Sequence, residues 1–70
     1  MELKQNAYYT TTNSNICILV LSLDNETDDT IDADLVYLTK SGRLLGTEKV
    51  TLKKANLDRW IQIPSVPFSI

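Results

Sequence analysis

Residues 31–52 read IDADLVYLTKSGRLLGTEKVTL, and this stretch decides the fold. Apolar residues take every second place before the turn and return after it: Ile31, Ala33, Leu35 and Tyr37, then Leu44, Val50 and Leu52. A period of two is typical of a β-strand with one buried face, and Gly42 supplies turn chemistry between the two runs. The stretch therefore predicts an antiparallel hairpin with strands 31–39 and 43–52.

One register of this hairpin brings apolar side chains together and opposite charges together. The pairs that it predicts are Ile31–Leu52, Ala33–Val50 and Tyr37–Gly46 on one face, with Asp34–Lys49, Val36–Thr47 and Leu38–Leu45 on the other. A shift by one residue would set Asp34 opposite Glu48, which are like charges. Two geometries of the tip give this register. One is a two-residue turn made of residues 41–42, and the other is a four-residue loop, 40–43, with Gly42 at positive φ, so the geometry of the tip stays open.

Three further runs predict strands, which makes five in all. Residues 7–12, rich in tyrosine and threonine, predict a first strand at an edge, and residues 59–63 predict the last strand. Residues 16–23 predict a strand that is apolar on both faces. Its two sets are Ile16, Ile18 and Val20 on one side, and Cys17, Leu19, Leu21 and Leu23 on the other. Between strands, residues 53–58 form a polar link with room for a helical turn. We expect residues 1–70 to form a single all-β domain, a small antiparallel five-stranded sandwich or open barrel.

The small size of the chain predicts that it needs a partner to stay folded. A chain of 70 residues buries only about 60% of its unfolded surface. Cys17 is its one cysteine and it has no histidine, so an internal disulfide and a structural zinc site are excluded. We expect Cys17 to be an inert core residue, and we expect the chain to associate with another copy of itself.

The segment 60–70 carries no charge. Pro64 and Pro67 exclude a central strand beyond residue 63, yet the apolar residues there still alternate. A solvated tail rarely has this composition, so we expect residues 65–70 to dock on their own sheet or on a neighbour. The predicted interaction surface combines this tail with strand 16–23, and its residues are Ile16, Ile18, Val20, Val66, Phe68 and Ile70.

An acidic loop, residues 24–34, suggests an alternative function. The glycine and the final glutamate of an EF-hand loop that began at Asp24 would fall at Asp29 and Leu35, so that motif is absent. An irregular calcium site and a plain solvated loop both remain open. The third interpretation is a patch that imitates nucleic-acid phosphates, as in a small phage-type inhibitor of a nuclease or host-defence protein. The residues at the centre of that patch are Asp28, Asp29, Asp32 and Asp34.

Trp60 is the candidate for a further alternative, carbohydrate binding by ring stacking, and core packing of its ring is the competing interpretation.

Enzyme chemistry is not expected. Without histidine, proton transfer falls to carboxylates, lysine or tyrosine. A carboxylate needs a walled pocket to raise its pKa, and a chain this short has little volume for one. We predict no catalytic residue, no cofactor and no metal ion.

Charge is unevenly distributed along the chain. Residues 1–39 carry one lysine and seven carboxylates, a balance of −6, and residues 40–70 carry six basic and two acidic groups, a balance of +4. We expect the two halves to cancel across the hairpin. A net charge of −2 with no basic cluster predicts no binding to nucleic acid.

The apolar run 16–21 is far too short for a membrane span, and no apolar signal segment follows Lys4. We expect a cytoplasmic site of synthesis, which a virion or particle component would share.

The sequence therefore predicts a non-catalytic structural or adaptor module whose partner is itself or another protein. The alternation, the turn at Gly42 and the segment with Trp60 and Ile61 resemble parts of immunoglobulin-like and fibronectin-like β modules of bacteria and phages. Those modules are about 100 residues long and have more strands, so the resemblance assigns no family.

Overall fold

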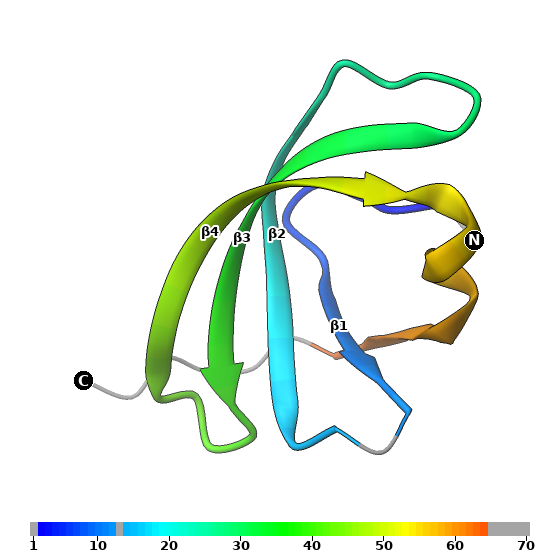
Figure 1. Cartoon of the computed structure of the whole chain (residues 1–70). Coiled ribbons are helices and arrows are strands. Elements are labelled where there is room, and N and C mark those ends of the chain that lie inside the picture. The colour runs from blue at the N-terminus through cyan, green and yellow to red at the C-terminus, as the bar shows by residue number, and fades with distance from the viewer. Residues whose placement is uncertain (1, 13, 65–70) are drawn as a thin grey trace.

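The computed structural model describes residues 2–12 and 14–64, which form five strands and one short 3₁₀-helix (Figure 1). The elements are β1 (Tyr8–Thr11), β2 (Ile16–Asp24), β3 (Thr30–Thr39), β4 (Leu44–Lys53), η1 (Lys54–Arg59) and β5 (Trp60–Ile63). All five strands belong to one antiparallel sheet with the order β4-β3-β2-β1-β5. The predicted small all-β fold is thus confirmed, as an open sheet and not a closed barrel.

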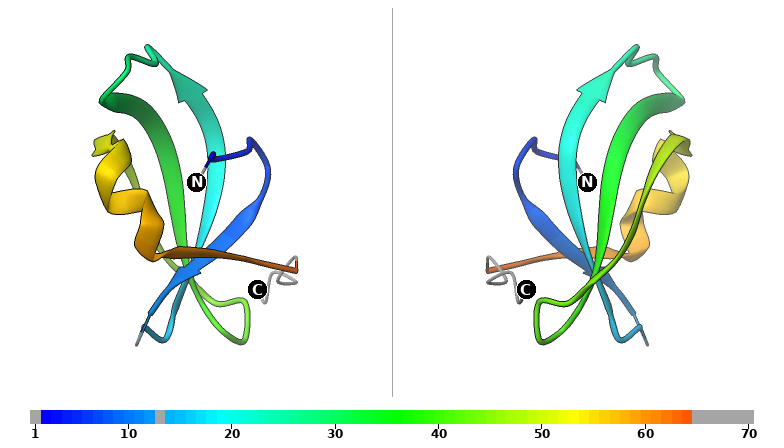
Figure 2. Two further views of the ribbon diagram at one scale, coloured as in Figure 1. Left: turned by 90° about the vertical axis from the view of Figure 1, so that its right-hand side faces the viewer. Right: turned by 90° about the vertical axis from the view of Figure 1, so that its left-hand side faces the viewer.

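The first strand does not lie at an edge, contrary to the sequence prediction. β1 pairs with β2 on one side and with β5 on the other. Figure 2 shows how this is possible: the sheet twists so strongly that β5 runs across the direction of β3 and β4, with η1 to one side. The two edge strands are therefore β4 and β5.

The central hairpin has the predicted register over most of its length. Pairs such as Ile31–Leu52, Asp34–Lys49 and Tyr37–Gly46 are opposite one another in β3 and β4. Near the tip the prediction is wrong, because Leu38 pairs with Leu44 and not with Leu45.

A three-residue loop at the tip explains this difference. The Gly42 N–H donates to the Thr39 carbonyl at 2.9 Å, the Thr39 N–H donates to the Arg43 carbonyl at 2.9 Å, and Gly42 has φ of 90°. In such a loop a left-handed residue follows the turn. Thr39 then lies opposite Arg43, one place away from the register of the rest of the hairpin. The register shift between Tyr37 and Leu38 leaves Leu45 as an extra residue on β4, and this bulge restores the register.

β2 contains a second bulge, at Leu21. The β2–β3 register shifts between Val20 and Ser22, so Leu21 has no opposite residue, and its side chain is exposed. An extra residue reverses the alternation of the side chains that follow it. Leu23 therefore packs on the same side as Ile18 and Val20, and its predicted place beside Cys17 is wrong.

Apolar residues occupy both faces of the sheet, as predicted for strand 16–23. The larger cluster lies on the side of η1, here called the η1 face, and its buried residues are Leu3, Tyr9, Ile18, Val20, Ile31, Ala33, Leu35 and Leu57. The opposite side, here called the second face, holds the cluster of Cys17, Leu19, Val36 and Leu38, with Tyr8 and Ile63 packed against it.

η1 forms in the polar link where a helical turn was an open option. Its buried residue, Leu57, is 2% exposed and joins the core of the η1 face. The Lys54 N–H donates to the Asp29 carbonyl at 2.8 Å, and the Trp60 N–H donates to the Leu57 carbonyl, so both ends of η1 are fixed. Nowhere in residues 2–12 and 14–64 is there a helix long and apolar enough to cross a membrane.

Candidate functional site

An apolar strip crosses all five strands on the second face of the sheet. One row of opposing residues consists of Leu44, Leu38, Cys17, Thr10 and Ile61. The adjacent row consists of Thr47, Val36, Leu19, Tyr8 and Ile63. These two rows, here called the apolar strip, run from one edge of the sheet to the other.

The apolar strip is buried at its centre and exposed at its ends. Leu38 is 0% exposed and Cys17 3%, whereas Leu44 on β4 is 57% exposed and Ile61 on β5 is 53% exposed. The position of Cys17 agrees with the expected core role. Leu44 and Ile61 are exposed residues that were not predicted from the sequence. The alternation of Ile61 with Ile63 in an uncharged segment shows that the two side chains share a face. It does not show that β5 lies at the edge of the sheet, which is why Ile61 is exposed.

The other half of the second face is polar. Two further rows of opposing residues lie there: Lys49, Asp34 and Ser22, followed by Thr51, Asp32 and Asp24. The Ser22 hydroxyl donates to Asp34 Oδ2 at 2.7 Å, and Lys49 Nζ lies 3.9 Å from Asp34 Oδ1. This exposed ion pair confirms the predicted pairing of Asp34 with Lys49, although such pairs contribute little to stability.

Asp32 is held in its ionised form. The Thr51 hydroxyl donates to Asp32 Oδ1 at 2.6 Å, and Asn25 Nδ2 donates to Asp32 Oδ2 at 3.0 Å. These two hydrogen bonds, the one from Thr51 being the stronger influence, lower the pKa of the Asp32 carboxyl. A general acid near neutral pH needs a raised pKa, so Asp32 is unsuited to that role.

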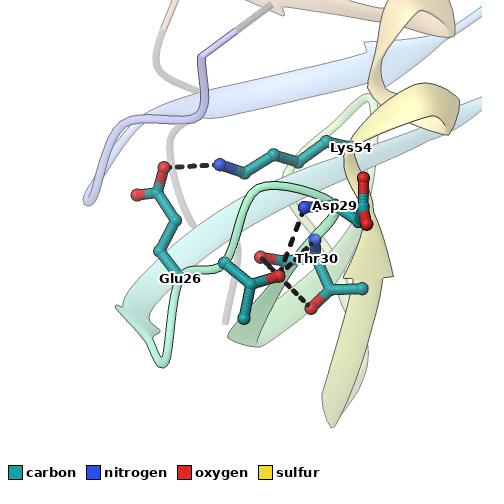
Figure 3. A network of polar contacts seen from close by, with 5 residues as sticks. Glu26, Asp29, Thr30 and Lys54 are labelled. Carbon is teal, nitrogen blue, oxygen red and sulfur yellow. Dashed lines mark hydrogen bonds and ion pairs between the residues drawn. The ribbon is translucent and has the colours of Figure 1, made fainter.

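The loop between β2 and β3 is ordered by its own polar contacts (Figure 3). The Thr27 hydroxyl accepts from the N–H of Asp29 at 3.2 Å and from that of Thr30 at 2.9 Å. Glu26 Oε2 lies 2.6 Å from Lys54 Nζ at the start of η1. The loop and η1 are therefore joined by a charged contact as well as by the backbone bond from Lys54 to Asp29.

The predicted acidic patch is divided between two places. Asp32 and Asp34 lie on the second face with hydrogen-bonding partners, whereas Asp28 and Asp29 lie in the exposed loop. Within residues 2–12 and 14–64, no three acidic, histidine or cysteine side chains come together in a group that could hold a metal ion.

Trp60, the candidate for ring stacking, packs against the chain's own core. Its ring centroid lies 5.8 Å from that of Tyr9, with the planes tilted by 55°. Tyr9 is fully buried, and Trp60 is half-buried beside the cluster of the η1 face. Tilted pairs at this separation are a normal form of aromatic core packing.

The predicted interaction residues of β2 are distributed differently from the expectation. Ile16 is exposed, but Ile18 and Val20 are 7% and 0% exposed because they form part of the core of the η1 face. These two side chains are therefore core residues, and their predicted place on an interaction surface is wrong. Its remaining members, Val66, Phe68 and Ile70, lie outside the described residues.

The two edges of the sheet differ in charge. β4 carries Glu48, Lys49 and Lys53 along its ten residues. β5 consists of four uncharged residues, WIQI, and its pairing with β1 has no bulge. Charged side chains and bulges are two common protections of a sheet edge against pairing with another strand, and β5 has neither; its protection is limited to its short length and the Pro64 that follows it.

The backbone groups that β5 presents outward can be deduced from its neighbours. The Val20 N–H donates to the Ala7 carbonyl, so Ala7 and every second residue after it direct their backbone groups toward β2. Tyr8 and Thr10 then direct theirs toward Ile63 and Ile61, their partners in β5. The N–H and carbonyl groups of Gln62 and the carbonyl of Trp60 consequently point away from β1, whereas the Trp60 N–H already donates to the Leu57 carbonyl.

The described residues thus offer an apolar strip, an uncharged sheet edge and a set of surface carboxylates with small polar partners. Comparison of the chain with protein-family models, with curated proteins and with solved structures finds no match in any of the three.

Proposed function

We propose that this chain is a non-catalytic protein-interaction module that self-associates by antiparallel pairing of β5 with β5 of a second copy. The observation that carries the proposal is the β5 edge, which is uncharged, has no bulge and exposes Ile61. Strand addition at such an edge gives main-chain hydrogen bonds and lets the side chains set the register.

A twofold axis through Ile61, perpendicular to the sheet, gives the favoured register. Trp60 then lies opposite Gln62 of the second copy, and the Gln62 N–H of each copy donates to the Trp60 carbonyl of the other. Ile61 lies opposite Ile61 of the second copy in a pair without direct hydrogen bonds, where side chains approach most closely. The apolar strip would continue across the axis from one copy into the other.

The β4 edge is unsuited to the same pairing. The Lys54 N–H donates to the Asp29 carbonyl, so the backbone groups of Lys49 and of every second residue around it point away from the sheet. A twofold pairing centred on the middle of β4 would place either Glu48 opposite Glu48 or Lys49 opposite Lys49. Like charges that face each other across strands are destabilising. The contrast between the edges supports β5 as the interface.

The non-catalytic character is part of the proposal. The chain has no histidine, and the pKa of Asp32 is lowered where a general acid would need it raised. A pairing of four-residue strands is also small beside the roughly 1,200–2,000 Å² of a standard interface, so we expect a weak dimer that dissociates on dilution.

The test compares two equally exposed apolar residues at opposite ends of the apolar strip. Ile61→Lys places two lysines against each other in the proposed interface, whereas Leu44→Lys adds the same charge at the β4 edge. In sedimentation equilibrium over a hundredfold range of concentration, the unchanged chain should shift from monomer to dimer. Leu44→Lys should do the same, and Ile61→Lys should remain a monomer throughout.

Two results would overturn the proposal. One is an unchanged chain that stays monomeric at the highest concentration. The other is a loss of association that is equal in Ile61→Lys and Leu44→Lys, which would place the contact on the second face as a whole and not at β5.

A further inference from the structure

The outer edge of β4 presents its backbone over a longer stretch than β5 does. β4 has ten residues, and its pairing with β3 has no bulge between Gly46 and Lys53. It lies on the side of the sheet that faces the viewer in the right-hand view of Figure 2. Because the backbone groups of Lys49 point away from the sheet, those of Thr47 and Thr51 do the same by alternation. These N–H and carbonyl groups can bond to a further strand.

Two lysines lie on the second face at this edge. Lys49 and Lys53 are separated by an even number of residues of one strand, so both side chains project on the same side as Asp34, and both are exposed. Lys49 Nζ lies 3.9 Å from Asp34 Oδ1, and its side chain is still 83% exposed. The ammonium group is therefore accessible from the edge, where a carboxylate on an added strand would lie.

The η1 face is apolar at the same edge. Val50 and Leu52 are half-buried and pack against the cluster of that face. Because β4 ends the sheet, an apolar side chain on an added strand would lie beside these two and extend the core. The two faces of the edge thus select different side chains, acidic on the second face and apolar on the η1 face.

We propose that the β4 edge binds an extended segment of another protein with the pattern acidic, apolar, any residue, apolar, acidic. Antiparallel addition places the acidic residues opposite Lys49 and Lys53 and the apolar residues opposite Val50 and Leu52. The central residue of the segment lies opposite Thr51. Main-chain hydrogen bonds supply the affinity, and the two lysines select the charge of the partner.

The occupant is a different protein and not a second copy of the chain. Pairing of β4 with β4 is opposed by like charges, so the charges that would attract an acidic segment also repel a second copy. The sequence does not contain the required pattern either. Its acidic residues recur at the right spacing in 24–28 and 28–32, but Asn25 and Asp29 stand where the first apolar residue is needed.

The test uses a short blocked peptide in which valine, threonine and valine stand between two glutamates, with serines at both ends. A control peptide has lysine in place of both glutamates. Binding to the isotope-labelled full chain is followed by amide hydrogen exchange. The glutamate peptide should protect the N–H groups of Lys49 and Thr51, because they bond to the added strand. The Val50 N–H points toward β3 and should change little.

A charge exchange tests whether the lysines select the partner. Lys49→Glu combined with Lys53→Glu should weaken binding of the glutamate peptide at least about tenfold and strengthen binding of the lysine peptide. Lys40→Glu combined with Arg43→Glu changes the net charge equally at the exposed hairpin tip, away from the proposed contacts, and should bind as the unchanged chain does. The amide spectrum of each variant shows whether it is folded.

Three results would overturn the proposal. One is the absence of binding at millimolar glutamate peptide, and another is equal binding of both peptides to the unchanged chain. The third is protection of the Gln62 N–H in place of that of Lys49, which would put the peptide on the β5 edge. The proposal does not depend on the β5 dimer, because Ile61→Lys should leave binding of the glutamate peptide unchanged. The two proposals can therefore fail independently.

Discussion

Tyr37 combines a half-buried ring with a hydroxyl that donates to a carboxylate. Its Oη lies 2.8 Å from Glu48 Oε2 on the neighbouring strand, and the ring packs against the core of the η1 face. Burial, and then the hydrogen bond to Glu48, raise the pKa of Tyr37 to about 12. Both effects favour the neutral hydroxyl, so the folded chain holds this proton more strongly than the unfolded chain does.

Alkaline pH should therefore destabilise the chain through Tyr37. The stabilisation is complete below about pH 10, the ordinary tyrosine pKa, and is lost as the pH rises to about 12. Over this pH range the Tyr37→Phe variant should lose less stability than the unsubstituted chain. The difference should be on the order of 1 kcal/mol, because solvent screens the interaction of this partly exposed group. Urea denaturation followed by Trp60 fluorescence on both sides of pH 10 measures it. An equal loss in both proteins would contradict the assignment, since Tyr8 and Tyr9 are common to both.

The two glycines of the hairpin should respond in opposite ways to alanine. Gly42 has a φ of 90°, so Gly42→Ala should cost about 1–2 kcal/mol of stability. At Gly46 an added Cβ would meet nothing within 4 Å, so Gly46→Ala should be neutral or stabilise by up to about 1 kcal/mol. The shift of the urea midpoint in each variant is the measurement. Destabilisation of similar size at both positions would show that the loop is not the one described.

At the scale of the elements, the sequence predicted local pairing well and irregularities poorly. The register of β3 with β4 follows from alternating side chains and an attractive Asp34–Lys49 pair, both of which are local. The bulge at Leu21 leaves no mark in the pattern, because residues 16–21 are all apolar and so show no alternation that an extra residue could interrupt. The edge status of β5 depends on its pairing with β1, and the two segments are far apart in the chain.

η1 should contribute to stability almost entirely through Leu57. This side chain is 2% exposed in the core of the η1 face, so Leu57→Ala should cost about 2–5 kcal/mol, enough to unfold much of a small domain. Asn56, its exposed neighbour, gives the control, and Asn56→Ala should change stability by less than about 0.5 kcal/mol. Thermal unfolding by circular dichroism compares the two variants. Similar midpoints would show that η1 does not anchor the sheet.

At the scale of the molecule, the sequence predicted a chain with two apolar faces and internally balanced charge. Contacts of Asp34 with Lys49 and of Glu26 with Lys54 join the acidic and basic halves, as expected for charges that cancel. The candidate site was predicted only in part. An apolar strand allows contact on either face, and alternation alone could not show that Ile18 and Val20 belong to the core. Ile61 is exposed because the sheet ends at β5, which is a property of the assembled fold.

The bulge in β2 has a consequence for the evolution of chain length. Val20 pairs with Leu35 and Ser22 pairs with Asp34, which are consecutive residues of β3, so Leu21 is surplus to the ladder. Loss of Leu21 alone would leave every other pair of β2 and β3 facing the same neighbour. Loss of Val20 or Ser22 would instead move Leu21 into the vacated place, opposite Leu35 or Asp34, and would likewise leave the other pairs unchanged. The bulge therefore makes this point of β2 tolerant of a shortening by one residue, which elsewhere in the strand would turn the side chains that follow to the other face.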